Sequence, residues 1–146
     1  MIEFLGSYQN PTSGTIALTI DGTDIAMTGA ATLRTIEFSS GKAEVSANYK
    51  DAGIVPFSVT DSSGAKPITE TTNGFVVKPE KFVFSNVQRV SYDFLNPGAT
   101  SAGGDVFITA GEDFTATVSA VNSLGDVTEN YGNETSRWYF LNTRIG

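Results

Sequence analysis

The sequence predicts an all-β protein, and three observations support that prediction. Apolar and polar residues alternate with a period of two over residues 15–20, 43–49 and 114–121, as they do in strands with one face on a core. Glycine is abundant, at 15 residues, and turn signals such as Asp21-Gly22 separate the alternating stretches. No segment keeps the i, i+3, i+4 spacing of an amphipathic helix for more than about one turn. We therefore expect many short strands joined by turns.

The first half of the chain reads as a succession of such strands. They are expected at residues 2–5, 15–20, 31–38, 43–49, 55–59 and 75–78. Asp21-Gly22 predicts a hairpin that returns through Ile25 and Met27. The segment 62–74 is polar and rich in turn residues, and Pro79 ends the last strand because proline cannot donate to a ladder.

The chain is organised around the pair of strands at residues 43–49 and 55–59. Asp51 and Gly53 form the corner between them, since Asp can bond its own backbone and Gly can take positive φ. A strand, an Asp-x-Gly corner and a second strand are typical of the late strands of an immunoglobulin-like sandwich. One face is expected to carry the core side chains of both strands: Ala43, Val45, Ala47, Tyr49, Val55, Phe57 and Val59.

Two tandem immunoglobulin-like units are predicted, residues 1–78 and residues 79–146. After Pro79 the pattern restarts with expected strands at 81–87, 90–95, 106–110, 114–121 and 127–131. Only about five strands are expected in this half, whereas a complete sandwich usually needs ~7. The second unit is therefore expected to be incomplete or to borrow strands from the first.

Composition excludes several classes of function. The net charge is −7 and neither half carries a basic patch, so nucleic acid and anionic membrane surfaces are not expected partners. Cysteine and histidine are absent, which excludes disulfides, thiolate metal sites and Ser-His or Cys-His dyads. No apolar run approaches the ~20 residues of a membrane helix. The start of the chain lacks a signal-peptide pattern, so we expect either no independent export or an internal piece of a longer exported chain.

One pair of carboxylates is a candidate site. If Ser39–Lys42 closes a hairpin, Phe38 faces Ala43 and Glu37 faces Glu44, with Cβ atoms ~5 Å apart. That spacing could suit a cation or the acid pair of a retaining glycosidase. The favoured interpretation is two solvated glutamates screened by salt and by Lys42. Ser39 and Ser40 beside Lys42 are read as turn formers rather than as a nucleophile and its base.

Other candidate sites have simpler interpretations. Calcium ligands could come from two groups, Asp21, Asp24 and Asp51, or Glu112 and Asp113, but turn formation is the favoured role. Gly98, Gly103 and Gly104 lack the lysine and the helix of a phosphate loop. Trp138, Tyr139 and Phe140 could stack on a sugar, although adjacent strand residues alternate faces and some should be core. No catalytic, cofactor-binding or metal-ligating residue is predicted.

Three stretches together resemble a known family. They are FSSGKAEVSANYKDAGIVPFSVTD, FVVKPEKFVFS and AGEDFTATVSAVNSLGDVTENYG, within residues 36–132. Their order resembles the immunoglobulin-like region of MshQ-like proteins, which are associated with biogenesis of the mannose-sensitive haemagglutinin type IV pilus. The positions that carry the resemblance are Tyr49, Asp51, Gly53, Val76, Val77, Pro79, Asn122, Gly125, Asn130 and Tyr131. Val55 and Phe57 stand where immunoglobulin domains often carry a tyrosine corner, so none is predicted.

The resemblance implies an exported cell-surface or pilus-associated protein and supplies no catalytic residue. We expect a non-enzymatic structural or adhesive module whose partners are neighbouring domains of a longer surface protein or pilus components. The alternative is a carbohydrate-binding sandwich that uses Tyr139 and nearby loops.

Overall fold

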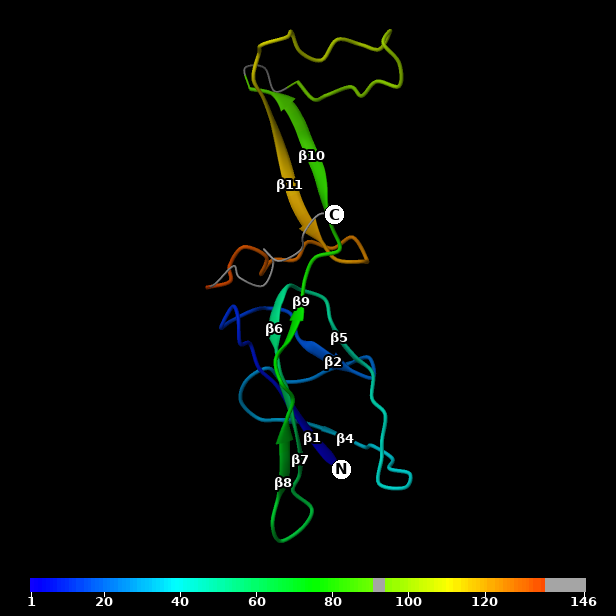
Figure 1. The fold of residues 1–146 in the computed structure, drawn as a ribbon, viewed down its shortest axis with the longest axis vertical. Helices are drawn as coiled ribbons and strands as arrows, with labels where there is room; N and C mark the ends of the chain where they lie inside the picture. The colour runs from blue at the N-terminus through cyan, green and yellow to red at the C-terminus, as the bar shows by residue number, and fades with distance from the viewer. Residues whose placement is uncertain (91–93, 136–146) are drawn as a thin grey trace. The chain divides into compact units, whose positions relative to one another are not determined.

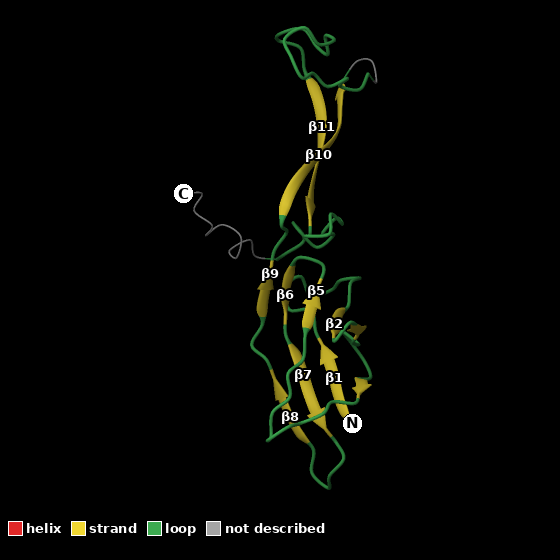
Figure 2. Ribbon diagram, turned by 90° about the vertical axis from the view of Figure 1, so that its right-hand side faces the viewer, coloured by secondary structure: helices red, strands yellow, loops and turns green. Residues whose placement is uncertain are grey.

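The computed structural model describes residues 1–90 and 94–135, and all regular secondary structure in these residues is β-strand (Figures 1 and 2). The prediction of an all-β fold is confirmed. No helix in these residues is long and apolar enough to cross a membrane.

Nine strands precede Pro79, and two long strands follow it within the described residues. They are β1 (Ile2–Gly6), β2 (Leu18–Ile20), β3 (Thr23–Asp24), β4 (Thr32–Arg34), β5 (Ala47–Tyr49), β6 (Gly53–Val55), β7 (Phe57–Asp61), β8 (Ile68–Thr71), β9 (Phe75–Val77), β10 (Lys81–Arg89) and β11 (Phe114–Val121).

The chain divides into two compact units. Among the described residues, the first contains Met1–Pro79 together with residues 128–135, and the second is Glu80–Val127. The sequence had placed all of residues 79–146 in one second unit, whereas residues 128–135 pack with the first. We call residues 128–135 the return segment.

Three antiparallel sheets make up the first unit, with strand orders β4-β1-β7-β8, β3-β2-β5 and β6-β9 (Figure 1). The predicted hairpin at Asp21-Gly22 is confirmed, because Ile20 pairs with Thr23 and both turn residues have positive φ. The strand β8 was not predicted. Its four residues are all exposed, so it has no alternation of buried and exposed side chains to reveal it.

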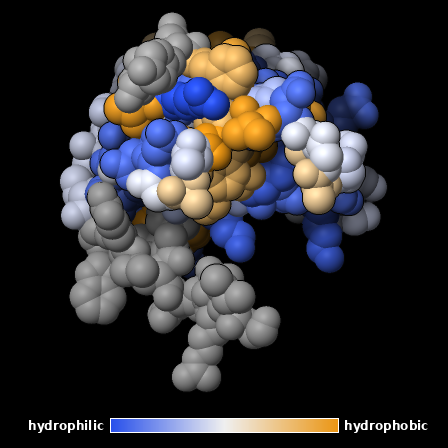
Figure 3. Space-filling view, turned by 90° about the horizontal axis from the view of Figure 1, so that it is seen from above, coloured by the Kyte–Doolittle hydropathy of each residue, from blue (hydrophilic) through white to orange (hydrophobic). Residues whose placement is uncertain are grey.

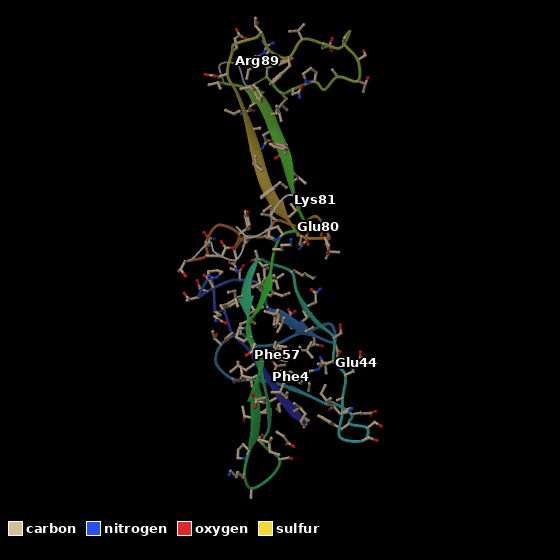
Figure 4. All side chains as sticks on the ribbon, viewed as in Figure 1. Phe4, Glu44, Phe57, Glu80, Lys81 and Arg89 are labelled. Atoms are coloured by element: carbon tan, nitrogen blue, oxygen red, sulfur yellow. The ribbon has the colours of Figure 1, made fainter. Side chains whose placement is uncertain are left out.

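The core of the first unit is formed by side chains from several of these strands. Its buried members are Phe4, Leu18, Ile20, Ile25, Met27, Tyr49 and Val55. Phe57 packs against them, with its ring centroid 6.4 Å from that of Phe4 and 6.4 Å from that of Phe75 (Figure 4). The inward positions predicted at Leu18, Ile20 and Val55 are thus confirmed. The prediction that Ala43 and Ala47 also face the core is wrong, because both residues are exposed.

The stretch read as one strand at 55–59 is two strands in two sheets. Val55 pairs with Phe75 in the β6-β9 sheet, whereas Phe57 pairs with Gly6 of β1. Pro56 lies between them, and it cannot donate to a ladder. Its carbonyl oxygen accepts a hydrogen bond from the backbone of Ser7 at 3.0 Å. The chain changes sheets at this proline while its alternation continues.

The hairpin expected between residues 31–38 and 43–49 is shorter than predicted. Ser39 and Lys42 exchange backbone hydrogen bonds of 2.8 and 3.0 Å, which confirms the turn. Beyond it the two arms separate, because β4 pairs with β1 and β5 pairs with β2. The predicted ladder that placed Glu37 opposite Glu44 is therefore wrong, since each arm finds a partner in a different sheet.

The second unit contains one long antiparallel hairpin, β10-β11. The strand predicted at 114–121 is confirmed as β11, but its side chains do not alternate between buried and exposed: residues 114–118 are all exposed, and Ala120 and Val121 at its end are both buried. The strands expected at 90–95, 106–110 and 127–131 are absent from the described residues there. These residues form loops and turns, with isolated bridges between Gln88 and Leu95 and between Val121 and Val127. Apolar side chains are exposed on this unit, among them Phe82, Phe84, Phe114 and Val118. The view from above shows apolar residues (orange) bordered by hydrophilic ones (blue) (Figure 3).

Candidate functional site

The most unusual group in the first unit is a buried carboxylate at the corner after β5. Asp51 is only 1% exposed. Its Oδ1 atom accepts hydrogen bonds from the backbone N–H of Ala52 at 2.7 Å and of Asn130 at 3.0 Å. Its Oδ2 atom has no hydrogen-bond partner. The Asp-x-Gly corner was predicted as a turn, and it also holds the return segment, whose Asn130 is 79 positions away.

Gly53 allows this corner to lie close to the preceding loop. Its φ is +143°, which favours glycine. A Cβ atom built there would lie 2.7 Å from the carbonyl oxygen of Asn10. Ile54 donates its backbone N–H to that same oxygen at 2.8 Å. The glycine is thus required both by the backbone conformation and by the neighbouring loop.

A tyrosine lies on the other side of Asn130. The Asn130 amide Nδ2 donates to the hydroxyl of Tyr49 at 3.1 Å. Burial and the negative charge of Asp51 raise the pKa of Tyr49 to about 12, and burial and Asp51 also raise the pKa of Tyr8. Both phenols stay protonated at neutral pH, so the Tyr49 hydroxyl can accept the amide proton as a neutral group.

The end of the return segment has a second anchor. Asn10 is 7% exposed, and its Oδ1 atom accepts from both the backbone N–H of Thr135 at 2.9 Å and its hydroxyl at 3.1 Å. The Glu134 Oε2 atom accepts from the Gly132 backbone at 2.7 Å. Asp51, Tyr49 and Asn10 therefore hold residues 130–135 on the first unit through side-chain hydrogen bonds, and we call these three residues the polar anchor.

A cavity of about 510 Å³ lies between the loop 11–15 and the return segment. Its polar lining comes from two stretches more than 100 residues apart in sequence: Thr12, Ser13, Thr15, Glu129, Asn130, Asn133 and Thr135. The Thr15 hydroxyl donates to the Glu129 Oε2 atom at 3.2 Å. This hydrogen bond joins the two stretches across the opening of the cavity.

The residues singled out from sequence do not form a common site. Glu37 and Glu44 are both exposed and are not paired in any strand, which agrees with the interpretation as solvated glutamates. Ser39 and Lys42 form the hairpin turn. Trp138, Tyr139 and Phe140 lie outside the described residues.

Three of the acidic candidates for calcium, Asp21, Asp51 and Glu112, accept hydrogen bonds from backbone N–H groups. The Asp21 carboxylate accepts from the Ser46 backbone at 2.8 Å, and the Glu112 carboxylate accepts from the Thr109 backbone at 3.1 Å. Asp24 is exposed on β3. No group of three or more acidic residues among the described residues could hold a metal ion.

Sequence reasoning missed the polar anchor. Asn130 entered only as one of the positions that carry the family resemblance, and Asn10 was not singled out. An apolar alternation gives no signal for buried polar residues in loops. The one available hint was that Tyr49 and Asp51 flank the corner of a buried strand.

Comparisons with known proteins assign both halves of the chain. A model described as the first Ig-like domain of a domain of unknown function, DUF6701, matches residues 1–78. A model for the second domain of DUF6701 matches residues 78–143. Neither the curated proteins nor the solved structures that were searched contain a match. Because these two models together match residues 1–143, the chain belongs to the DUF6701 family, and its residues 1–78 form that family's first Ig-like domain, in agreement with the all-β fold.

Proposed function

We propose that this chain is a non-enzymatic structural module of a bacterial cell-surface or pilus-associated protein, related to the MshQ-like proteins. Its partners would be neighbouring domains of a longer surface protein or pilus components. The family supplies an Ig-like domain, a fold that suits stiff spacing of a binding tip. The link to MshQ-like proteins is supported by the Tyr49, Asp51 and Gly53 corner and by the Asn130-Tyr131 pair.

The observation that carries the proposal is the polar anchor. Asp51 is buried, and its Oδ1 atom bonds two backbone N–H groups, so this carboxylate holds chain segments together. A general acid or base must reach the proton that it transfers, and a carboxylate that is 1% exposed cannot reach a substrate in solution. These buried polar groups of the first unit hold chain segments together, as a stiff spacer requires.

Localisation provides the first test. In intact cells of the bacterium that encodes the chain, an antibody raised against it should label the surface. Protease added to intact cells should remove that label while a cytoplasmic control protein survives. Label that appears only after cell lysis would contradict the proposal.

Activity provides the second test. The purified chain should show no turnover in panels of glycosidase, esterase and peptidase substrates. Hydrolysis that persists through repurification, and that Glu37→Gln or Glu44→Gln abolishes, would replace the structural role with a catalytic one.

A further inference from the structure

The cavity between the loop 11–15 and the return segment has the chemistry of a ligand site. At about 510 Å³ it falls within the ~300–1,000 Å³ range of small-molecule sites. Hydroxyl groups line it at Thr12, Ser13, Thr15 and Thr135, and amides line it at Asn130 and Asn133. Hydroxyls and amides both donate and accept hydrogen bonds. The wall therefore suits a ligand whose own polar groups do the same.

The lining disfavours other classes of small ligand. Among the residues that the structure describes, none of the nine in the lining is Lys or Arg, and Glu129 is acidic, which disfavours anions. Glu129 is also the only carboxylate among these nine described residues, whereas Ca²⁺ takes about 6–8 oxygen ligands with carboxylates prominent among them. Pro11 is the only one of the nine with an apolar side chain of any size, so within the described part of the lining an apolar ligand would find little surface to bury.

The wall is held in place before any ligand binds. The Glu129 carboxylate is bonded by the Thr15 hydroxyl at 3.2 Å, and the Glu129 carbonyl accepts from Asn133 Nδ2 at 2.9 Å. At Gly14 a Cβ atom would lie 2.8 Å from the ring of Tyr8 and 2.9 Å from Asn130 Nδ2. The loop and the return segment thus approach as closely as glycine permits. Binding would require little further ordering of the protein, which favours affinity.

We propose that this cavity binds a neutral saccharide unit. A pyranose carries several hydroxyls that each donate and accept, and a carboxylate beside amides can accept from two of them. The proposal does not depend on the aromatic run at 138–140 or on the role as a spacer. A surface module could have the structural role without binding a saccharide, and it could bind a saccharide without having the structural role.

Titration of the full chain, 1–146, with methyl pyranosides of neutral hexoses tests the proposal. Two-dimensional amide NMR spectra would be recorded as each glycoside is added, with sodium glucuronate and calcium chloride as comparison solutes. At least one neutral glycoside should shift the signals of residues 12–15 and 129–135 saturably. Glucuronate and calcium should leave those signals in place.

Matched variants locate the site. Glu129→Ala should weaken binding by roughly tenfold or more, because hydrogen bonds to a charged group are among the strong ones. Thr12→Val, which keeps the shape and removes a hydroxyl, should weaken it by a smaller factor. Glu44→Ala removes another exposed glutamate of the first unit and should leave binding unchanged. Melting temperatures of all three would verify that each variant is folded.

Four results would overturn the proposal. They are no saturable shift with any neutral glycoside, shifts confined to other parts of the chain, a response to glucuronate or calcium alone, and equal losses with Glu129→Ala and Glu44→Ala. The surface-labelling test of the structural role does not depend on sugar binding. A failure of the sugar-binding proposal can therefore be distinguished from a failure of the proposed structural role.

Discussion

Removal of the Asp51 carboxylate should release the return segment from the first unit. In Asp51→Ala the backbone N–H groups of Ala52 and Asn130 lose their acceptor. Each orphaned buried donor costs about 1–3 kcal/mol. Part of that cost is offset, because the wild type already buries the unpartnered Oδ2 atom and the variant removes it. We expect a net loss of about 2–3 kcal/mol in the free energy of unfolding of this unit.

Asp51→Asn is the matched control. Its Oδ1 atom can still accept from both N–H groups, and its amide nitrogen takes the place of the unpartnered Oδ2 atom. The charge is lost, so the two bonds weaken from charged to neutral ones and the expected loss is about 0.5–1 kcal/mol. The difference in the free energy of unfolding between the two variants therefore measures the contribution of the hydrogen-bond acceptor separately from that of the charge.

Amide hydrogen exchange at Asn130 gives a local readout, which is preferable because a chain with two units need not unfold in one transition. A loss of about 2 kcal/mol at this site corresponds to roughly 30-fold faster exchange in Asp51→Ala. Amides in β1 should be affected less than those of residues 130–135. Equal exchange in Asp51→Ala and Asp51→Asn, or unchanged protection at Asn130 in both, would refute the reasoning that the carboxylate holds the segment.

Three further predictions concern the same unit. Burial raises the pKa of the Tyr49 hydroxyl to about 12, so the unfolded chain loses this proton at a lower pH than the folded chain does. The free energy of unfolding should therefore fall as the pH rises from about 10 to 12, by up to about 1.4 kcal/mol per pH unit. In alkaline thermal melts, Tyr49→Phe should begin with a lower melting temperature and show a flatter decline. In urea unfolding, Gly53→Ala should lower the free energy of unfolding by more than about 2 kcal/mol, because its Cβ would lie 2.7 Å from a backbone oxygen. Gly41→Ala, at φ +75° with open space around it, should lower it by about 1 kcal/mol. Equal losses would count against the close approach at Gly53. Phe57→Ala should lower the free energy of unfolding by about 2–3 kcal/mol, at or below the lower end for a buried phenylalanine, because the ring is only partly buried. Ser58→Ala should lower it by about 0.5–1 kcal/mol, because the hydrogen bond of Ser58 to β1 is lost. Similar small losses at both positions would mean that the inward face is misassigned.

Local chemistry decided much of the fold. Alternation placed Leu18, Ile20 and Val55 inward, and turn residues with access to positive φ closed the hairpins at Asp21-Gly22 and Ser39–Lys42. These features depend on neighbours a few residues apart, which is the range over which a sequence pattern carries information. The structural role of the Asp51-Gly53 corner was readable for the same reason.

The sequence did not predict which sheet each strand joins. The alternation through residues 55–59 is unbroken, yet Pro56 divides it between two sheets, and the arms of the Ser39–Lys42 hairpin pair with β1 and β2 rather than with each other. A period of two specifies which face a side chain occupies and leaves open which strand lies beside it. The predicted contact of Glu37 with Glu44 failed on that point.

By itself the sequence determined that this chain is all-β, that it begins with an immunoglobulin-like sandwich, and that histidine and cysteine chemistry is excluded. Only the tertiary structure decided that residues 128–135 return to the first unit, that Asp51 and Asn10 hold them there, and that this return creates a polar cavity. The physical reason is the separation along the chain. A hydrogen bond between residues 79 or 125 positions apart leaves no periodic trace in either stretch, since its free energy depends on burial that the whole fold provides.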